Sequence, residues 1–164
     1  MAQQDVYAFL ELDGIEGEAQ DSKYEKKIEL QSFSWGASNS SSFASGTGGS
    51  TAKGQIHDIS VSMYTSRASL RLMERAVNGQ HIKKGKLTLC KLHGETKIGY
   101  FELDLEHVVV TSFQIAAGGD GHLPMESATL HFVKVKAKYL PQGNEGDATG
   151  NVDFGWDLQK NVSH

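Results

Sequence analysis

The chain has 164 residues, a formal net charge of −4 and 18 glycines. A chain of this length fits one domain that buries roughly 70% of its unfolded surface without metal or disulfide staples. The acidic balance with scattered Lys and Arg argues against a nucleic-acid-binding protein. The single cysteine excludes an intrachain disulfide, and no run approaches the ~18 apolar residues of a membrane-spanning helix.

Alternating apolar and polar residues predict three strands in the first part of the chain, at residues 6–12, 25–35 and 55–65. The apolar side of the second strand switches part-way along, so we expect this strand to contribute to two surfaces. One of its faces carries Ile28, Leu30, Ser32 and Ser34, and the other carries Phe33 and Trp35.

A long Gly/Ser-rich loop, residues 36–54, separates the second and third strands. Eleven of its 19 residues are Gly or Ser. A loop of this length inside a compact domain is usually functional or disordered. Phe43 is its one large apolar residue, so we consider a flexible arm whose Phe43 anchors on a neighbouring protomer. Gly46, Gly48 and Gly49 would let the backbone of that arm lie close to the partner surface.

The period changes after the third strand, and residues 66–79 predict one amphipathic α-helix. Leu70, Met73 and Val77 recur at i, i+3 and i+7, which is typical of the buried stripe of a helix. Ser66 or Ser69 is suited to cap the N-terminus, and Gly79 suits the left-handed position after the last turn.

Four more strands are predicted, at residues 86–92, 96–105, 108–116 and 125–139. The last one changes the phase of its alternation between Phe132 and Val133, which indicates a β-bulge at a barrel corner. We expect its lysines at 134, 136 and 138 to form a basic row toward solvent. The tail carries Phe154, Trp156 and Leu158, so we expect it to dock on the sheet.

No cluster of residues indicates a catalytic, metal or cofactor site. The seven histidines lack local zinc spacing, and the glycines of the long loop match neither a dinucleotide fingerprint nor a P-loop. Alternating carboxylates on one strand face are expected to be solvated rather than catalytic, and the acids at 13–21 do not have EF-hand spacing. Cys90 is expected to be a small core residue. The acids on the strand are Glu102, Asp104 and Glu106.

Seven segments, in order, resemble the haemolysin-coregulated protein (Hcp) family, the inner-tube subunits of type VI secretion systems. Each segment alone is weak, but the ordered set is specific and spans nearly the whole chain. The segments are DGIEGEAQD at 13–21, SFSWG at 32–36, the glycine-rich loop closing on KG at 53–54, TSRAS at 65–69, VTSF at 110–113 leading to GGDG at 118–121, ESATLHFVKVKAKY at 126–139 and FGWDLQKN at 154–161.

The resemblance implies a single domain over residues 1–164. Its expected fold is mainly β: an antiparallel β-barrel of two packed sheets with one helix. It implies a structural protein and not an enzyme, forming hexameric rings that stack into a hollow tube. The implied partners are other copies, a contractile sheath, a spike protein and small effectors in the lumen, without membrane insertion. Because the N-terminal residues lack a signal-peptide pattern, we expect cytoplasmic assembly followed by secretion without a cleaved signal peptide.

Two sets of residues are predicted to make the contacts of such a tube. The long loop is expected to supply the contact between stacked rings, and two small polar residues of the second strand are expected to face the lumen. An alternative is a monomeric carbohydrate- or ligand-binding β-module that uses Trp156 or Tyr64 as a stacking platform. The predicted contact residues are Phe43, Gly46, Gly48, Gly49 and Lys53, and the predicted lumen residues are Ser32 and Ser34.

Overall fold

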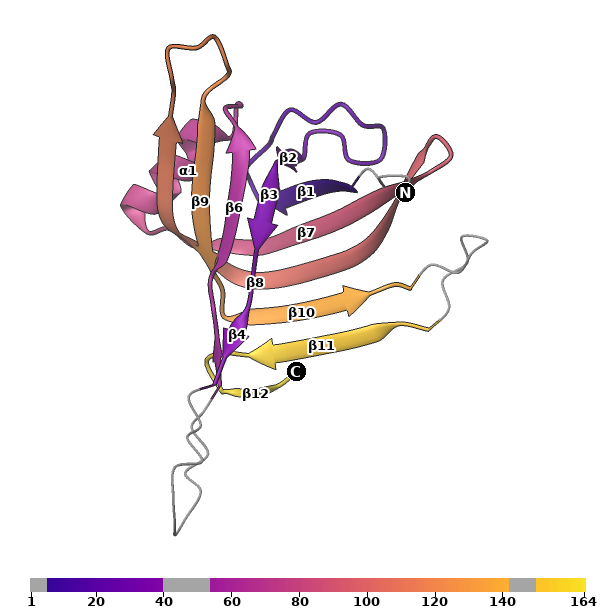
Figure 1. Cartoon of the computed structure of the whole chain (residues 1–164). Helices are drawn as coiled ribbons and strands as arrows, with labels where there is room; N and C mark the ends of the chain where they lie inside the picture. Colours follow the sequence, from indigo (N-terminus) through magenta and orange to yellow (C-terminus); the bar gives the residue numbers. More distant parts are fainter. Residues whose placement is uncertain (1–5, 40–53, 142–149) are drawn as a thin grey trace, which may run out of the picture.

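The computed structural model describes residues 6–39, 54–141 and 150–164. These residues form a mainly β structure with antiparallel strands and one α-helix, as the sequence predicts (Figure 1). The elements in chain order are β1 (Val6–Leu12), β2 (Ile28–Leu30), β3 (Ser32–Ser34), β4 (Ala37–Ser38), β5 (Gln55–Ile56), β6 (Ile59–Tyr64), α1 (Ser69–Asn78), β7 (Ile82–His93), β8 (Thr96–Ala116), β9 (Met125–His131), β10 (Lys134–Tyr139), β11 (Val152–Asp157) and β12 (Val162–Ser163).

Apart from the separate two-stranded pair β4-β5, the strands form two sheets that share β8. The large sheet has the order β12-β11-β10-β8-β7-β1-β2, and the small sheet has the order β3-β6-β9-β8. Figure 1 shows the strands of the small sheet running steeply across those of the large one, which is the orthogonal way of packing two sheets. The described strands leave β3 without a partner in the large sheet. The two packed sheets are therefore observed, with an open side between β3 and the large sheet.

One long strand, β8, belongs to both sheets, whereas the sequence predicted two strands there. Its first half pairs with β7 and β10, and its second half pairs with β9. His107 lies between the halves and has a φ of 54°, a conformation that lets the chain turn from one sheet into the other. The gap predicted at residues 106–107 is thus a bend within one continuous strand.

The predicted phase change at Phe132 and Val133 marks the corner where the chain leaves β9 and enters β10. The Phe132 side chain is fully buried, and the Val133 backbone N–H donates to the Glu106 carbonyl at 3.0 Å. The second predicted strand behaves in the same way: β2 pairs with β1 in the large sheet and β3 pairs with β6 in the small one. The prediction that the second strand serves two surfaces is confirmed, whereas the predicted bulge within 125–139 is a break between the two strands β9 and β10.

The core lies between the two sheets and contains the alternating apolar residues of the predicted strands. Ile59, Val61 and Met63 of β6 are all buried, as their phase predicts. Cys90 is also buried, in a smaller cluster with Phe9 on the other side of the large sheet. Burial raises the pKa of the Cys90 thiol, so this thiol is a poor nucleophile.

The helix is shorter than the predicted range 66–79, with 10 residues at Ser69–Asn78, and it presents a different face to the core. Leu72 is 1% exposed and packs in the core, whereas the predicted stripe points to solvent: Leu70 is 71% exposed, Met73 38% and Val77 83%. Leu70 and Leu72 are two residues apart and therefore point about 200° apart around the helix, so only one of them can face the core. The sequence prediction assigned the wrong one of the two to the core. The core selects Leu72 because Ala68 and Ala76, four residues to either side, let α1 approach the sheet closely.

The ends of α1 differ in how well they match the prediction. Ala68 is the N-cap residue and makes no side-chain cap, so neither predicted serine holds that position. Ser66 and Ser69 instead shape the turn before the helix: the Ser66 hydroxyl accepts from the Ala68 N–H, and the Ser69 hydroxyl accepts from the Ser66 N–H. Gly79 ends the helix with a φ of 65°, as predicted.

The C-terminal tail docks as an added pair of strands. β11 pairs with β10 along its length, and β12 pairs with β11. Phe154 and Trp156 stack with parallel ring planes at a centroid distance of 6.4 Å, and Trp156 packs against the core. The docking that the sequence predicted is confirmed.

Candidate functional site

The solvent face of the small sheet is lined by hydroxyl groups from all four of its strands. Alternation places every second residue of each strand on this face, and the register aligns them in rows across the sheet. One row runs through Ser32, Ser62, Ser127 and Gln114, and the next runs through Ser34, Ser60, Thr129 and Ser112. We call this surface the hydroxyl face. These two rows carry hydroxyl and amide groups and no charged or large apolar side chain, whereas the next row carries Tyr64 and Met125, which are 41% and 39% exposed.

A β-bulge adds one more hydroxyl to this face. The pairing of β8 with β9 shifts between Val110 and Ser112, so Thr111 and Ser112 both reach Thr129. The Thr129 hydroxyl lies 2.6 Å from each of the other two hydroxyls. The hydroxyl face is therefore held together by side-chain hydrogen bonds as well as by the backbone ladder.

This network of hydroxyl groups ends at two ionisable side chains, Asp58 and His131. The Thr111 hydroxyl donates to Asp58 Oδ2 at 3.1 Å, and His131 Nδ1 lies 2.8 Å from Asp58 Oδ1. The Asp58 carboxylate therefore has two side-chain partners, the Thr111 hydroxyl and the His131 imidazole.

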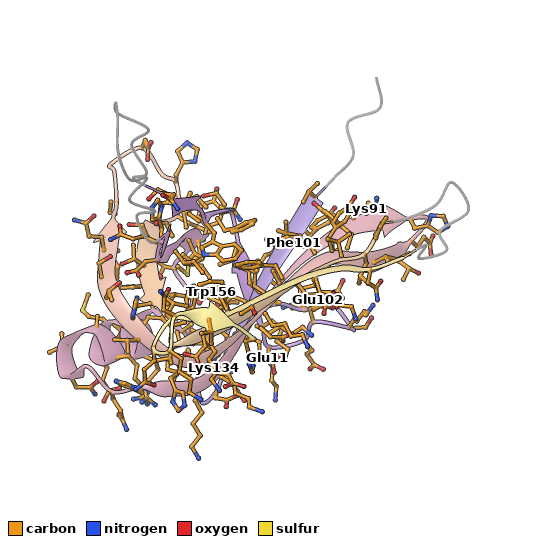
Figure 2. All side chains as sticks on the ribbon, turned by 90° about the horizontal axis from the view of Figure 1, so that it is seen from below. Glu11, Lys91, Phe101, Glu102, Lys134 and Trp156 are labelled. Atoms are coloured by element: carbon orange, nitrogen blue, oxygen red, sulfur yellow. The ribbon has the colours of Figure 1, made fainter. Side chains whose placement is uncertain are left out.

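The solvent face of the large sheet has the opposite character, because acidic and basic strands alternate across it. The three predicted lysines of β10 lie opposite the three carboxylates of β8. Lys86 of β7 approaches the same carboxylates from the other side, with Nζ 3.2 Å from Glu102 and 3.8 Å from Asp104. Figure 2 shows Phe101 and Glu102 on opposite sides of this sheet. The cross-strand pairs are Lys134–Glu106, Lys136–Asp104 and Lys138–Glu102.

These lysines place opposite charges along the carboxylate row. Each carboxylate of the row has a lysine as its cross-strand neighbour. Exposed pairs of this kind are worth less than about 1 kcal/mol each. The row therefore belongs to a surface of alternating charges.

The open side of the two-sheet core contains an aromatic groove. The groove has a volume of about 360 Å³ and lies between the end of β3 and strands β10 and β11. Trp35 forms part of it, and its buried indole N–H has no hydrogen-bond partner among the described residues. Large apolar side chains remain uncovered here, with Val152 65% and Phe154 46% exposed. The main lining residues are Trp35, Ile56, Phe101, Tyr139, Val152 and Phe154.

The predicted contact residues fall into two groups. Ser32 and Ser34 are exposed and belong to the hydroxyl face. That these two serines face a lumen stays a prediction. The predicted stacking residues Phe43, Gly46, Gly48, Gly49 and Lys53 lie outside the described residues. The sequence analysis missed the other hydroxyls of the face, which the repeated Ser-X-Ser alternation of β6 and the Ser-X-Thr of β9 could have indicated.

The described residues contain no cluster of metal-ligating side chains and no helix long and apolar enough to cross a membrane. Across residues 6–39, 54–141 and 150–164, no three His, Cys, Asp or Glu side chains gather where they could hold a metal ion. The one described helix is too short and too polar to cross a membrane.

Comparison with known proteins gives one consistent result. Residues 9–139 match the family described as "Type VI secretion system effector, Hcp". The chain is 32% identical to protein hcp1 of Pseudomonas aeruginosa over 158 residues, which covers 96% of this chain and 98% of the relative.

Solved structures agree with this match over nearly the whole chain. A type six secretion system protein superimposes with a TM-score of 0.90 at 31% identity and covers 98% of this chain and 100% of its own. Hcp1 from Salmonella typhimurium superimposes with a TM-score of 0.77 at 26% identity, covering 97% and 99% of the two chains.

Proposed function

This chain belongs to the Hcp family of type VI secretion proteins, and we propose that it is the structural subunit of a secretion tube. In this proposal residues 1–164 form one Hcp-like β-barrel domain, six copies close into a ring, and rings stack into a hollow tube. The tube assembles in the cytoplasm inside a contractile sheath, carries a spike protein at its tip and is secreted without a cleaved signal peptide.

The observation that carries the proposal is the contrast between the two solvent faces. A channel that must release its cargo needs an inner wall without charged or large apolar groups that would hold a protein tightly. The rows of the hydroxyl face meet that need, so we assign Ser32 and Ser34 with their neighbours to the lumen. Small effector proteins would then travel along a wall of hydroxyls. In this arrangement the charged face of the large sheet forms the outer surface of the ring.

The remaining predicted contacts fit the same arrangement. A heterologous contact that closes makes a ring, and one that does not close continues as a filament. We propose that the loop 36–54, with Phe43 as its anchor, makes the second kind of contact between stacked rings. Of the two platforms of the alternative, a monomeric ligand-binding module, Trp156 packs against the core, whereas Tyr64 is 41% exposed. The match to the Hcp family favours the tube subunit over this alternative.

Native mass spectrometry of the purified protein tests this function. We expect a six-fold species that persists as the protein is diluted through the micromolar range. A control variant, Lys136→Ala, changes the charged face, where Lys136 is exposed, and should leave that species intact. A strictly monomeric protein at high micromolar concentration would contradict the proposal.

A further inference from the structure

One end of the hydroxyl face carries large apolar side chains instead of hydroxyl groups. The row beyond Ser62 and Ser127 consists of Tyr64 of β6, Met125 of β9 and Ala116 of β8. These residues lie two positions along each strand from the last hydroxyl row, so their side chains point to the same side of the sheet. Tyr64 is 41% exposed and Met125 is 39% exposed. The face therefore ends in an uncovered apolar strip.

The loop between β8 and β9 adds a third large apolar side chain at this end, because Leu123 is 68% exposed. The Thr65 backbone N–H and the Thr65 hydroxyl both donate to the Pro124 carbonyl, at 3.1 and 3.3 Å. The residue after Leu123 is thus fixed to the residue after Tyr64. Figure 1 shows this loop at the end of the small sheet that lies away from β4. We call Tyr64, Leu123 and Met125 the apolar rim.

The other end of the hydroxyl face has the opposite chemistry, because the network of hydroxyl groups ends there at Asp58 and His131. Asp58 precedes β6 and His131 ends β9, whereas the apolar rim lies where β6 ends and β9 begins. The face thus changes from apolar to ionisable side chains across its two rows of hydroxyls. In a ring of six copies with this face toward the lumen, the apolar rim becomes a closed band at one mouth.

We propose that the apolar rim is a cargo-binding site of the tube, and that an effector protein with an exposed apolar patch binds there, at one mouth of the ring. The rim presents a phenol ring, a thioether and an isobutyl group, so it fits an apolar surface of the cargo and not a charged one. Burying the uncovered part of these side chains favours binding, and six copies around one cargo add their contacts. This inference rests on the proposed tube and names the surface that holds its cargo.

Fluorescence anisotropy with a labelled pair of peptides tests the rim. One peptide is amphipathic, with leucine at i, i+3, i+4 and i+7, and the other has serine at these positions with the same length and charge. We expect six-fold rings to bind the leucine peptide and not the serine peptide. Tyr64→Ser combined with Met125→Ser should weaken binding of the leucine peptide about tenfold or more, because both apolar contacts are lost. Leu123→Ser, in the exposed loop, should weaken it without changing a strand. A benzophenone on the leucine peptide should crosslink to the rim.

Matched controls separate the rim from general apolar binding and from the proposed function. Leu70→Ser with Val77→Ser removes two side chains of α1 that are 71% and 83% exposed, more than those of the rim, and should leave peptide binding unchanged. Native mass spectrometry of each variant reports the ring separately, so rings that form but do not bind the leucine peptide would overturn the rim and leave the tube standing. Unchanged binding by the rim variants, or shorter tubes with unchanged binding, would also overturn it. The absence of rings in the wild type would count against the tube itself.

Discussion

Replacing Leu72 should destabilise the protein far more than replacing Leu70, although both are leucines on the same helix. Leu72 is 1% exposed and lies in the core cluster, whereas Leu70 is 71% exposed. Truncating a buried leucine to alanine costs about 2–5 kcal/mol, from lost transfer free energy and from the cavity left behind. A substitution on an exposed helix surface usually changes stability by less than about 0.5 kcal/mol. We therefore expect a difference of about 3 kcal/mol between Leu72→Ala and Leu70→Ala.

Urea unfolding followed by tryptophan fluorescence measures this difference, with all variants compared in the same oligomeric state. With a slope of about 2 kcal/mol per molar urea, the midpoint of Leu72→Ala should fall by about 1.5 M. Val77→Ala serves as a second surface control because Val77 is 83% exposed, and its midpoint should stay near that of the wild type. Equal destabilisation by Leu70→Ala and Leu72→Ala would refute the orientation of α1 and restore the stripe predicted from the sequence.

Three further outcomes are expected. Lys97 Nζ lies 2.9 Å from Asp21, and its hydrogen bond holds the pKa of Asp21 below the usual range. We therefore expect Asp21→Asn to destabilise the protein at pH 7. The difference in stability from wild type should vanish as the pH falls below the pKa of Asp21 in the folded protein. A pH-independent difference would contradict that reasoning. Both carboxylate oxygens of Glu126 are buried without a hydrogen-bond partner among the described residues. Glu126→Met should therefore raise the free energy of unfolding, measured by urea titration, by about 1–3 kcal/mol. A lower free energy of unfolding would refute the prediction for Glu126. Deleting residues 40–49 should leave six-fold rings intact but shorten the tubes seen in electron micrographs. Phe43→Ala should shorten the tubes less, because it removes only one apolar contact. Tubes of normal length would count against the loop as the stacking contact.

The sequence predicted the strands well wherever alternation had a clear phase. The phase change at Phe132 and Val133 revealed the corner between the two sheets, and the switch between Leu30 and Phe33 revealed a strand divided between them. Both signals are local, because the side-chain period of a strand is two residues and any slip moves the apolar set to the other face. A single sequence therefore suffices to find them.

The helix orientation and the extent of the hydroxyl face needed the structure. The face that α1 buries depends on which leucine the opposing sheet accepts, and that choice is made by tertiary packing around Leu72. The hydroxyl face combines residues from four strands, and only the register places Ser34, Ser60 and Thr129 in one row. The bulge that lets both Thr111 and Ser112 reach Thr129 cannot be recognised from the sequence of β8 alone, because it depends on the pairing with β9.

Cryo-electron microscopy of the assembled protein tests the central claim most directly, because it shows both the symmetry and the orientation of the subunit. We predict six copies around a central hole, with the hydroxyl face of the small sheet, including Ser32 and Ser34, forming the inner wall. The charged face of the large sheet, with Lys136, should lie on the outside. Separate single particles, or rings with the charged face lining the hole, would contradict the account.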